Sequence, residues 1–132
     1  MTISKIDTFP FSGFEKLKQE SIQENYKFLE RLENDWKENI NRFSKQGEAF
    51  YKVTINNELA AIGGINIDPF ENDNKIGRLR RLYVKNSFRK QKIGTKLVQH
   101  IITESKKHFM MIRLRTGSKI ASEFYLYLGF IY

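Results

Sequence analysis

The hydrophobic residues between Phe14 and Phe43 recur three or four positions apart, in a segment without glycine or proline. This spacing puts them on one face of an α-helix. We therefore expect either one long amphipathic helix or two shorter helices, with Asn25 or Asn34 as possible break points. The stripe consists of Ile22, Tyr26, Leu29, Leu32, Trp36, Ile40 and Phe43.

Three β-strands are expected in the middle of the chain. Residues 49–55 and 59–67 are rich in strand-forming residues, and Asn56-Asn57 between them is a two-residue hairpin signal. The polar segment 68–74 contains proline and an Asn/Asp cluster, which break a strand. Residues 76–84 form the third strand, so the pattern predicts a meander.

The second half of the chain predicts a helix, a strand and another helix. Ile93, Leu97 and Ile101 have helical spacing, and residues 109–114 read as a short buried strand whose two methionines fill the core. After a turn at residues 116–118, residues 120–128 carry another helical stripe, which ends at Gly129. The pattern predicts one domain of the α+β class, in which helices flank both faces of a mostly antiparallel twisted sheet.

The composition excludes several kinds of site. None of the 132 residues is cysteine, so disulfides, thiolate zinc sites and cysteine nucleophiles are excluded. Neither His100 nor His108 supports a metal site. The first residues lack the apolar region of a signal peptide, and no segment is apolar enough to span a membrane. A cytoplasmic location is the expectation.

Positive charge is concentrated in one part of the chain. The net charge is +8, but residues 75–119 carry 14 Lys/Arg and one acid, Glu104, whereas the remainder is net acidic. Such a segment predicts a polyanionic partner, which is either nucleic acid or a phosphorylated cofactor. The alternative is a solvated basic surface.

The loop before the helix at Ile93 is the most informative segment. A helix N-terminus presents unpaired N–H groups and a partial positive charge, and therefore favours anions such as a pyrophosphate. Arg89, Lys90 and Lys92 lie in the loop that enters this helix. Local charge and helix geometry thus agree on an anion site.

Two motifs here resemble those of the GNAT acetyltransferase superfamily. Leu82-Tyr83-Val84 followed by residues 89–97 (RKQKIGTKL) resembles its acyl-CoA motif, Q/R-x-x-G-x-G/A, with Arg89 first and Gly94 last. Ala121 and residues 124–130 (FYLYLGF) are similar to the Tyr-x-x-x-Gly-Phe ending of the family's final helix. The two motifs occur in the family's order, about thirty residues apart.

The resemblance implies acetyl-CoA as cosubstrate and a set of residues that contact it. Backbone groups next to Tyr83 would bind the pantetheine arm in a splay between strands, and loop amides would bind the pyrophosphate. Tyr125 would protonate the departing CoA thiolate as general acid. Ser118 stands where many members have an asparagine near the pantetheine. The residues implied in cofactor binding are Leu82, Tyr83, Val84, Arg89, Lys90, Gln91, Lys92, Ile93, Gly94, Thr95 and Ser118.

The sequence departs from the family pattern in two places. Lys92 replaces the first glycine of the motif and Lys90 replaces another frequent glycine, and glycine permits close approach of the backbone to phosphate. Each lysine either crowds the site or points outward and attracts phosphate, and we expect binding to be retained. The sequence stops at Tyr132, where the family continues with another strand. We expect a shortened C-terminus and a homodimer that completes the sheet edge.

The acceptor site is expected between the Tyr26–Phe43 helical region and the sheet, where Trp36 and Phe43 are core residues that could also line it. No glutamate lies on residues 76–84, where some relatives carry a base. Candidate bases are Asp68, Glu71, Glu33 and Asp35, each also explained as a solvated surface carboxylate. Arg80, Arg113 and Arg115 either recognise an acceptor carboxylate or form a cationic sheet surface.

The sequence therefore predicts an acetyl-CoA-dependent N-acetyltransferase that acts on a primary amine of a small molecule or peptide by direct attack. Two alternatives remain open. The basic segment with Tyr83 and Phe88 also suits a nucleic-acid-binding module. A non-catalytic acyl-CoA-binding regulator would keep the cofactor site without turnover.

Overall fold

The computed structural model describes residues 1–68, 73–115 and 123–127. Its helices and strands form one α+β arrangement, as the sequence predicts. In chain order they are β1 (Thr2–Lys5), α1 (Phe14–Gln23), α2 (Phe28–Lys37), β2 (Ala49–Ile55), β3 (Glu58–Ile67), β4 (Ile76–Val84), a short 3-10 helix η1 (Asn86–Phe88), α3 (Ile93–Ser105), β5 (Met111–Arg115) and β6 (Glu123–Tyr127).

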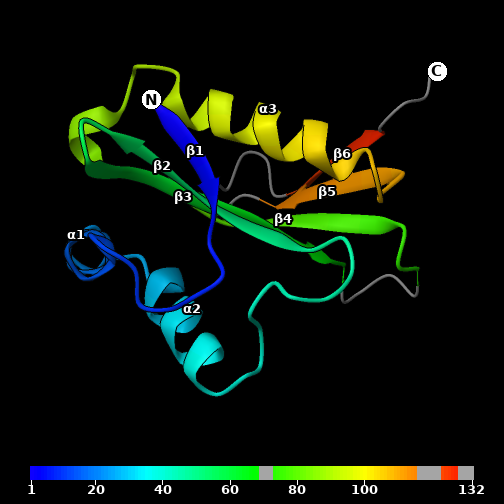
Figure 1. The fold of residues 1–132 in the computed structure, drawn as a ribbon, viewed down its shortest axis with the longest axis horizontal. Coiled ribbons are helices and arrows are strands. Elements are labelled where there is room, and N and C mark those ends of the chain that lie inside the picture. Colours follow the sequence, from blue (N-terminus) through cyan, green and yellow to red (C-terminus); the bar gives the residue numbers. More distant parts are fainter. Residues whose placement is uncertain (69–72, 116–122, 128–132) are drawn as a thin grey trace.

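The strands form a six-stranded sheet in the order β1-β2-β3-β4-β5-β6. All neighbouring pairs are antiparallel except β4 and β5, which are parallel because α3 connects them. Helices α1 and α2 cover one face of the sheet and α3 covers the other (Figure 1). The predicted fold class is confirmed.

Each face of the sheet has its own hydrophobic core. Leu97 and Ile101 of α3 are fully buried against one face. Leu17 of α1, Leu29 of α2 and Phe50 of β2 are fully buried on the opposite face. The two helical layers are therefore anchored independently to the sheet that separates them.

Asn25 separates α1 from α2. Its φ of 67° is left-handed, a conformation that asparagine tolerates better than most residues and that a helix cannot contain. Of the alternatives left open by the sequence, the structure has two helices with the break at Asn25, whereas Asn34 lies inside α2. The hairpin turn is also confirmed, because Asn56 and Asn57 have φ angles of 51° and 65°, as a tight turn between β2 and β3 requires.

Two elements differ from the sequence prediction. The strand β1 was not expected, since its four residues show little alternation, yet it pairs with β2 along its whole length. Residues 123–127 were expected in a helix but form β6, which pairs with β5. This short aromatic run suits either structure, because apolar runs of this length do not separate strand from helix and aromatic residues favour strands.

Candidate active site

Only the first half of β4 is paired with β5 among the described residues. The parallel ladder between β4 and β5 runs from Ile76 opposite Met111 to Leu79 opposite Leu114. β4 then continues to Val84, and no described residue of β5 pairs with this second half. Among the described residues, this part of β4 has no strand partner on the β5 side, and the Val84 carbonyl there accepts from Arg89. Such an edge can bind an extended ligand as it would bind an additional strand.

A bulge bends β4 at the same place. Ile62 of β3 pairs with Tyr83, and Gly64 pairs with Arg80. The two residues Arg81 and Leu82 of β4 therefore lie opposite the single residue of β3 between Ile62 and Gly64. Arg81 has a left-handed φ of 60°. A bulge of this kind redirects side chains and increases the local twist. It leaves the Leu82 side chain 36% exposed at the open edge.

The bulge also turns Arg81 towards α2. Its guanidinium Nη2 lies 3.5 Å from Oδ2 of Asp35 in α2. Burial, followed by the nearby charge of Arg80, lowers the pKa of Arg81 to about 10. The helix α2 is therefore tied by an ion pair to the strand at which the ladder opens.

The loop after β4 leads into α3 with an alternating backbone. Lys90 and Lys92 have left-handed φ angles of 66° and 62°, and Gln91 between them lies outside that region. Left-handed residues next to right-handed ones are the backbone pattern of anion-binding nests, in which successive amides point towards one concave side. Ile93 is buried and anchors the first turn of α3. The loop thus has left-handed residues where the sequence predicts an anion site, and the site itself stays a prediction.

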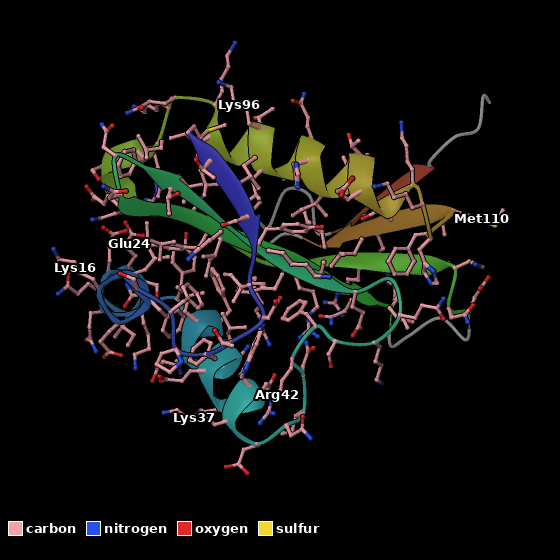
Figure 2. All side chains as sticks on the ribbon, viewed as in Figure 1. Lys16, Glu24, Lys37, Arg42, Lys96 and Met110 are labelled. Carbon is pink, nitrogen blue, oxygen red and sulfur yellow. The ribbon has the colours of Figure 1, made fainter. Side chains whose placement is uncertain are left out.

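The first turn of α3 extends this nest. No side chain caps the helix N-terminus, where Lys92 is the N-cap residue. The amides of Ile93, Gly94 and Thr95 have no acceptor within the helix, as in any first turn. Gly94 lies against β4, since a Cβ there would stand 3.1 Å from Cγ2 of Val84. Figure 2 shows Lys96, one turn along, projecting away from the sheet.

Arg89 holds the loop in place. Its Nε donates to the carbonyl of Val84 at 3.0 Å, and its two terminal nitrogens donate to Glu24 at 2.9 and 2.6 Å. The guanidinium also lies 5.3 Å from the centre of the Tyr83 ring. Its backbone amide donates to the carbonyl of Asn86 at 3.2 Å. The cationic side chain of Arg89 is thus already engaged within the protein.

Glu24 is the centre of this network and was not singled out from the sequence. Figure 2 shows it at the end of α1, on the side that faces the sheet. Its carboxylate lies 2.6 Å from the Tyr83 hydroxyl and accepts from Nδ2 of Asn86 at 3.1 Å. The Arg89 guanidinium, followed by the hydroxyl of Tyr83, lowers the pKa of Glu24 to about 2.

Tyr83 is unsuited to give up its proton. Its hydroxyl lies within 2.8 Å of Glu20 as well as contacting Glu24. Burial, together with these two carboxylates, raises the pKa of Tyr83 well above its usual value. Two acids four residues apart at the end of a helix could have indicated such a network, because negative charge there is unfavourable without an external partner.

A pocket of about 430 Å³ lies beside α2 on the face opposite α3. Nδ2 of each of the amides Asn41 and Asn66 donates to Oδ1 of the other at 2.9 Å. Glu48 accepts from Nδ2 of Asn66 at 3.0 Å, which fixes the loop after α2 to β3. The pocket is lined by Asp35, Asn39, Ile40, Asn41, Arg42, Ser44, Lys45, Glu48, Asn66, Ile67 and Arg80.

This pocket lies where the sequence placed the acceptor, but only some of the expected residues line it. Arg80 and Asp35 do. Trp36 and Phe43 are buried core residues that do not line it, although Phe43 borders a neighbouring pocket. Glu33 is instead paired with Lys18 at 2.8 Å.

Asp68 is buried and paired with Arg113, so its interpretation as a solvated surface carboxylate is wrong. Its Oδ2 accepts from Nη1 of Arg113 at 3.2 Å, and its side chain is fully shielded from solvent. This contact removes Arg113 from the candidates for a free acceptor-binding cation. Glu71 and Ser118 lie outside the described residues, as does the side chain of Arg115.

Tyr125 lies on β6, where it is opposite Arg113 of β5 in the sheet register. Its side chain lies outside the described part of the structure, so its role as general acid stays a prediction. Among the described residues no cluster of three metal-binding side chains occurs. None of the helices described is long and apolar enough to cross a membrane.

Comparisons with known proteins agree with the overall fold. Residues 46–132 match the family model described as an acetyltransferase (GNAT) domain. No curated protein sequence matches the chain significantly. Among solved structures, one from Exiguobacterium sp. 255-15, assigned as an acetyltransferase, is similar with a TM-score of 0.79 and 26% identity, over 89% of this chain and 77% of that one.

Two further structures share the fold at lower identity. An aminoglycoside 6'-N-acetyltransferase in complex with coenzyme A is similar with a TM-score of 0.64 and 22% identity, over 88% of this chain and 62% of that one. A GNAT family acetyltransferase from Staphylococcus aureus Mu50 is similar with a TM-score of 0.59 and 24% identity, over 87% and 73% of the two chains. All three share the overall fold of this chain.

Proposed function

Because the chain belongs to the GNAT family of acetyltransferases, we propose that it transfers the acetyl group of acetyl-CoA to a primary amine of a small molecule or peptide. The amine attacks the thioester directly. The observation that carries the proposal is the free edge of β4, which lies next to the uncapped first turn of α3. These two features suit the two ends of an elongated phosphorylated ligand.

The residues present fit coenzyme A. The open edge of β4 offers the backbone of Leu82 and Val84 to the amide groups of the pantetheine arm, and the exposed Leu82 side chain offers an apolar contact. The nest formed by residues 90–95 offers amides to the pyrophosphate, and Lys90 and Lys92 add charge. The similar aminoglycoside 6'-N-acetyltransferase was crystallised with coenzyme A.

Arg89 acts in this proposal as a positioning residue. It carries charge towards the phosphates, but its donors already bind Glu24 and Val84. It therefore holds the nest at a constant distance from β4 while backbone amides make the ligand contacts. Tyr83 contributes its backbone only, since its hydroxyl is held by two carboxylates.

Acetyl-CoA supplies an activated acetyl thioester, and the chain must orient it and manage two protons. Backbone amides beside the bulge at Leu82 would polarise the thioester carbonyl. Tyr125 would protonate the departing thiolate as general acid. Asp35, which lines the pocket beside β4, is the carboxylate best placed to accept the proton of the acceptor amine, directly or through water.

Calorimetry with acetyl-CoA, followed by a thiol-release assay over amines, amino acids and peptides, tests the proposal. Saturable binding and acceptor-dependent thiol release are expected. Binding without turnover on any acceptor would favour the non-catalytic regulator, and the absence of binding would exclude acetyl-CoA as the cosubstrate. A gel-shift assay with nucleic acid tests the remaining alternative.

We also propose a homodimer that extends the sheet. β6 is the last strand in the order of the described sheet, and the outer edge of a sheet favours pairing with another chain. Sedimentation at increasing protein concentration should show a dimer. A monomer at every concentration would exclude it.

A further inference from the structure

We propose that the pocket beside β4 selects an acceptor amine that also carries a carboxylate, and that Arg80 binds this carboxylate. The inference rests on the proposed function, because it assigns the substrate class of the same site. Arginine suits this task, since its planar guanidinium matches a carboxylate through two parallel hydrogen bonds.

The structure separates Arg80 from its neighbouring arginines. Arg81 is paired with Asp35, and Arg113 is paired with the buried Asp68. Arg80 lines the pocket, and among the described residues its side chain makes neither a hydrogen bond nor an ion pair, although its backbone pairs with Gly64 in the sheet. Its guanidinium is therefore available to a ligand.

The acids that line the pocket already have partners within the protein. Asp35 faces Arg81. Glu48 accepts from the backbone amides of Lys45 and Ile67 at 3.1 and 2.9 Å, in addition to Asn66. The negative charge of both carboxylates is thus offset by donors of the protein and adds little attraction for a polycation, while Arg42, Lys45 and Arg80 add positive charge around the same space.

The pKa of Arg81 provides independent support for excess positive charge. After burial, the largest contribution to its lowered pKa is repulsion by Arg80, and Arg31 and Arg78 add to it. Asp35 offsets only part of this repulsion. A bound carboxylate would reduce the repulsion between these arginines. The site therefore favours an anionic group next to them.

The pocket also has a size and an apolar edge that suit an amino acid. Its volume of about 430 Å³ is at the small end of ligand pockets. Ile40 lines it with a side chain that is 70% exposed, an apolar contact for the rest of the acceptor. By the same reasoning, a polycationic aminoglycoside should be a poor acceptor here.

A thiol-release assay with matched acceptors tests the inference. Phenylalanine and leucine are compared with phenylalaninamide and leucinamide, with phosphoethanolamine as a phosphate acceptor and kanamycin as a polycation. We expect kcat/KM for the free acids to exceed that for the amides by at least about tenfold. The amides lose their ammonium proton more readily, so amine protonation cannot produce this preference.

The Arg80 variants identify the residue responsible. Arg80→Gln should bring the ratio of kcat/KM for acids to that for amides close to one, mainly by raising KM for the acids, and should change kcat/KM for the amides much less. Arg80→Lys should keep part of the preference for acids that Arg80→Gln loses, because lysine keeps the positive charge but cannot form the two parallel hydrogen bonds of a guanidinium. Lys106→Gln is the control, since this exposed cation lies at the end of α3, on the other side of the sheet.

Several results would overturn the assignment. They are equal kcat/KM values for acids and amides, a preference that persists in Arg80→Gln, and a better rate with kanamycin or phosphoethanolamine than with every carboxylate. Calorimetry with N-acetylphenylalanine and its amide provides a readout without turnover. Acid-selective binding that Arg80→Gln abolishes supports the carboxylate site even if acetyl-CoA does not bind, and binding without this selectivity excludes it.

Discussion

The Arg89 guanidinium donates two hydrogen bonds to the Glu24 carboxylate, from Nη1 to Oε2 at 2.9 Å and from Nη2 to Oε1 at 2.6 Å. The two residues are 65 positions apart and join the end of α1 to the loop that precedes α3. The helix at one face of the sheet thereby restrains the candidate phosphate-binding loop, and Tyr83 lies between them. The geometry of the proposed cofactor site depends on this contact across the fold.

Glu24→Gln should destabilise the protein at neutral pH. It removes the charge from hydrogen bonds to Arg89 and Tyr83, which is expected to cost about 1–2 kcal/mol after allowance for partial exposure. Urea unfolding measures the loss. Glu38→Gln, at an exposed carboxylate without a partner among the described residues, should lose little or nothing. An equal loss in both variants would contradict the network.

The same pair predicts an acid dependence. The folded-state pKa of Glu24 is lowered to about 2 from an ordinary value of 4.5. Its stabilising contribution is therefore complete above about pH 4.5 and is lost as the pH falls towards 2. The difference in unfolding free energy between the native protein and Glu24→Gln should shrink over that interval. A difference independent of pH would contradict the assignment.

Lys92→Gly should stabilise the protein, because a non-glycine residue in left-handed backbone is strained. Relief of this strain exceeds the entropy that glycine adds to the unfolded chain, and a net gain of about 0.5–1 kcal/mol is expected. The same substitution at Lys96, inside α3, should instead cost about 1 kcal/mol. Losses of similar size at both positions would contradict the strain.

Lys92→Ala separates charge from backbone strain. It keeps the strained conformation and removes the cation, so acetyl-CoA affinity should fall by a few-fold at low salt, without the stability gain of Lys92→Gly. Both variants should approach the affinity of the native protein at high salt, because exposed charges are screened. Tighter binding of both variants would show that the lysine side chain crowds the site.

Tyr125→Phe should lower kcat while acetyl-CoA affinity changes little. The phenol is proposed to protonate the thiolate as it leaves, and general acid catalysis typically contributes 10²–10⁴-fold in rate. Steady-state kinetics together with acetyl-CoA calorimetry distinguish a chemical role from a binding role. An unaltered rate would remove Tyr125 from the acid role.

Asp35→Asn should lower kcat/KM, because this carboxylate is proposed to accept the acceptor's proton. A decrease of at least tenfold is expected. Glu33→Gln is the matched control, because this residue lies two positions away, pairs with Lys18 and does not line the pocket. An unchanged kcat/KM in Asp35→Asn, or an equal loss in both variants, would exclude the role of Asp35 as base.

Features that depend on residues close together in the sequence could be predicted from the sequence. The break at Asn25, the Asn56-Asn57 turn and the start of α3 each follow from local conformational preferences or periodicity. The acyl-CoA motif is local as well, and its backbone keeps the left-handed geometry even where Lys92 stands in place of glycine. The run at 123–127 marks the limit of such reading, because its pattern fits a helix or a strand.

Features that depend on distant residues were decided only by the tertiary structure. The sequence alone does not show that Arg89 is engaged by Glu24, or that Arg81 meets Asp35 across 46 residues. Nor does it show that Asp68 is buried with Arg113, which leaves Arg80 as the candidate for ligand recognition. The reason is physical: residue type determines the charge that a side chain carries, whereas packing of the chain determines whether another part of the protein has already neutralised it.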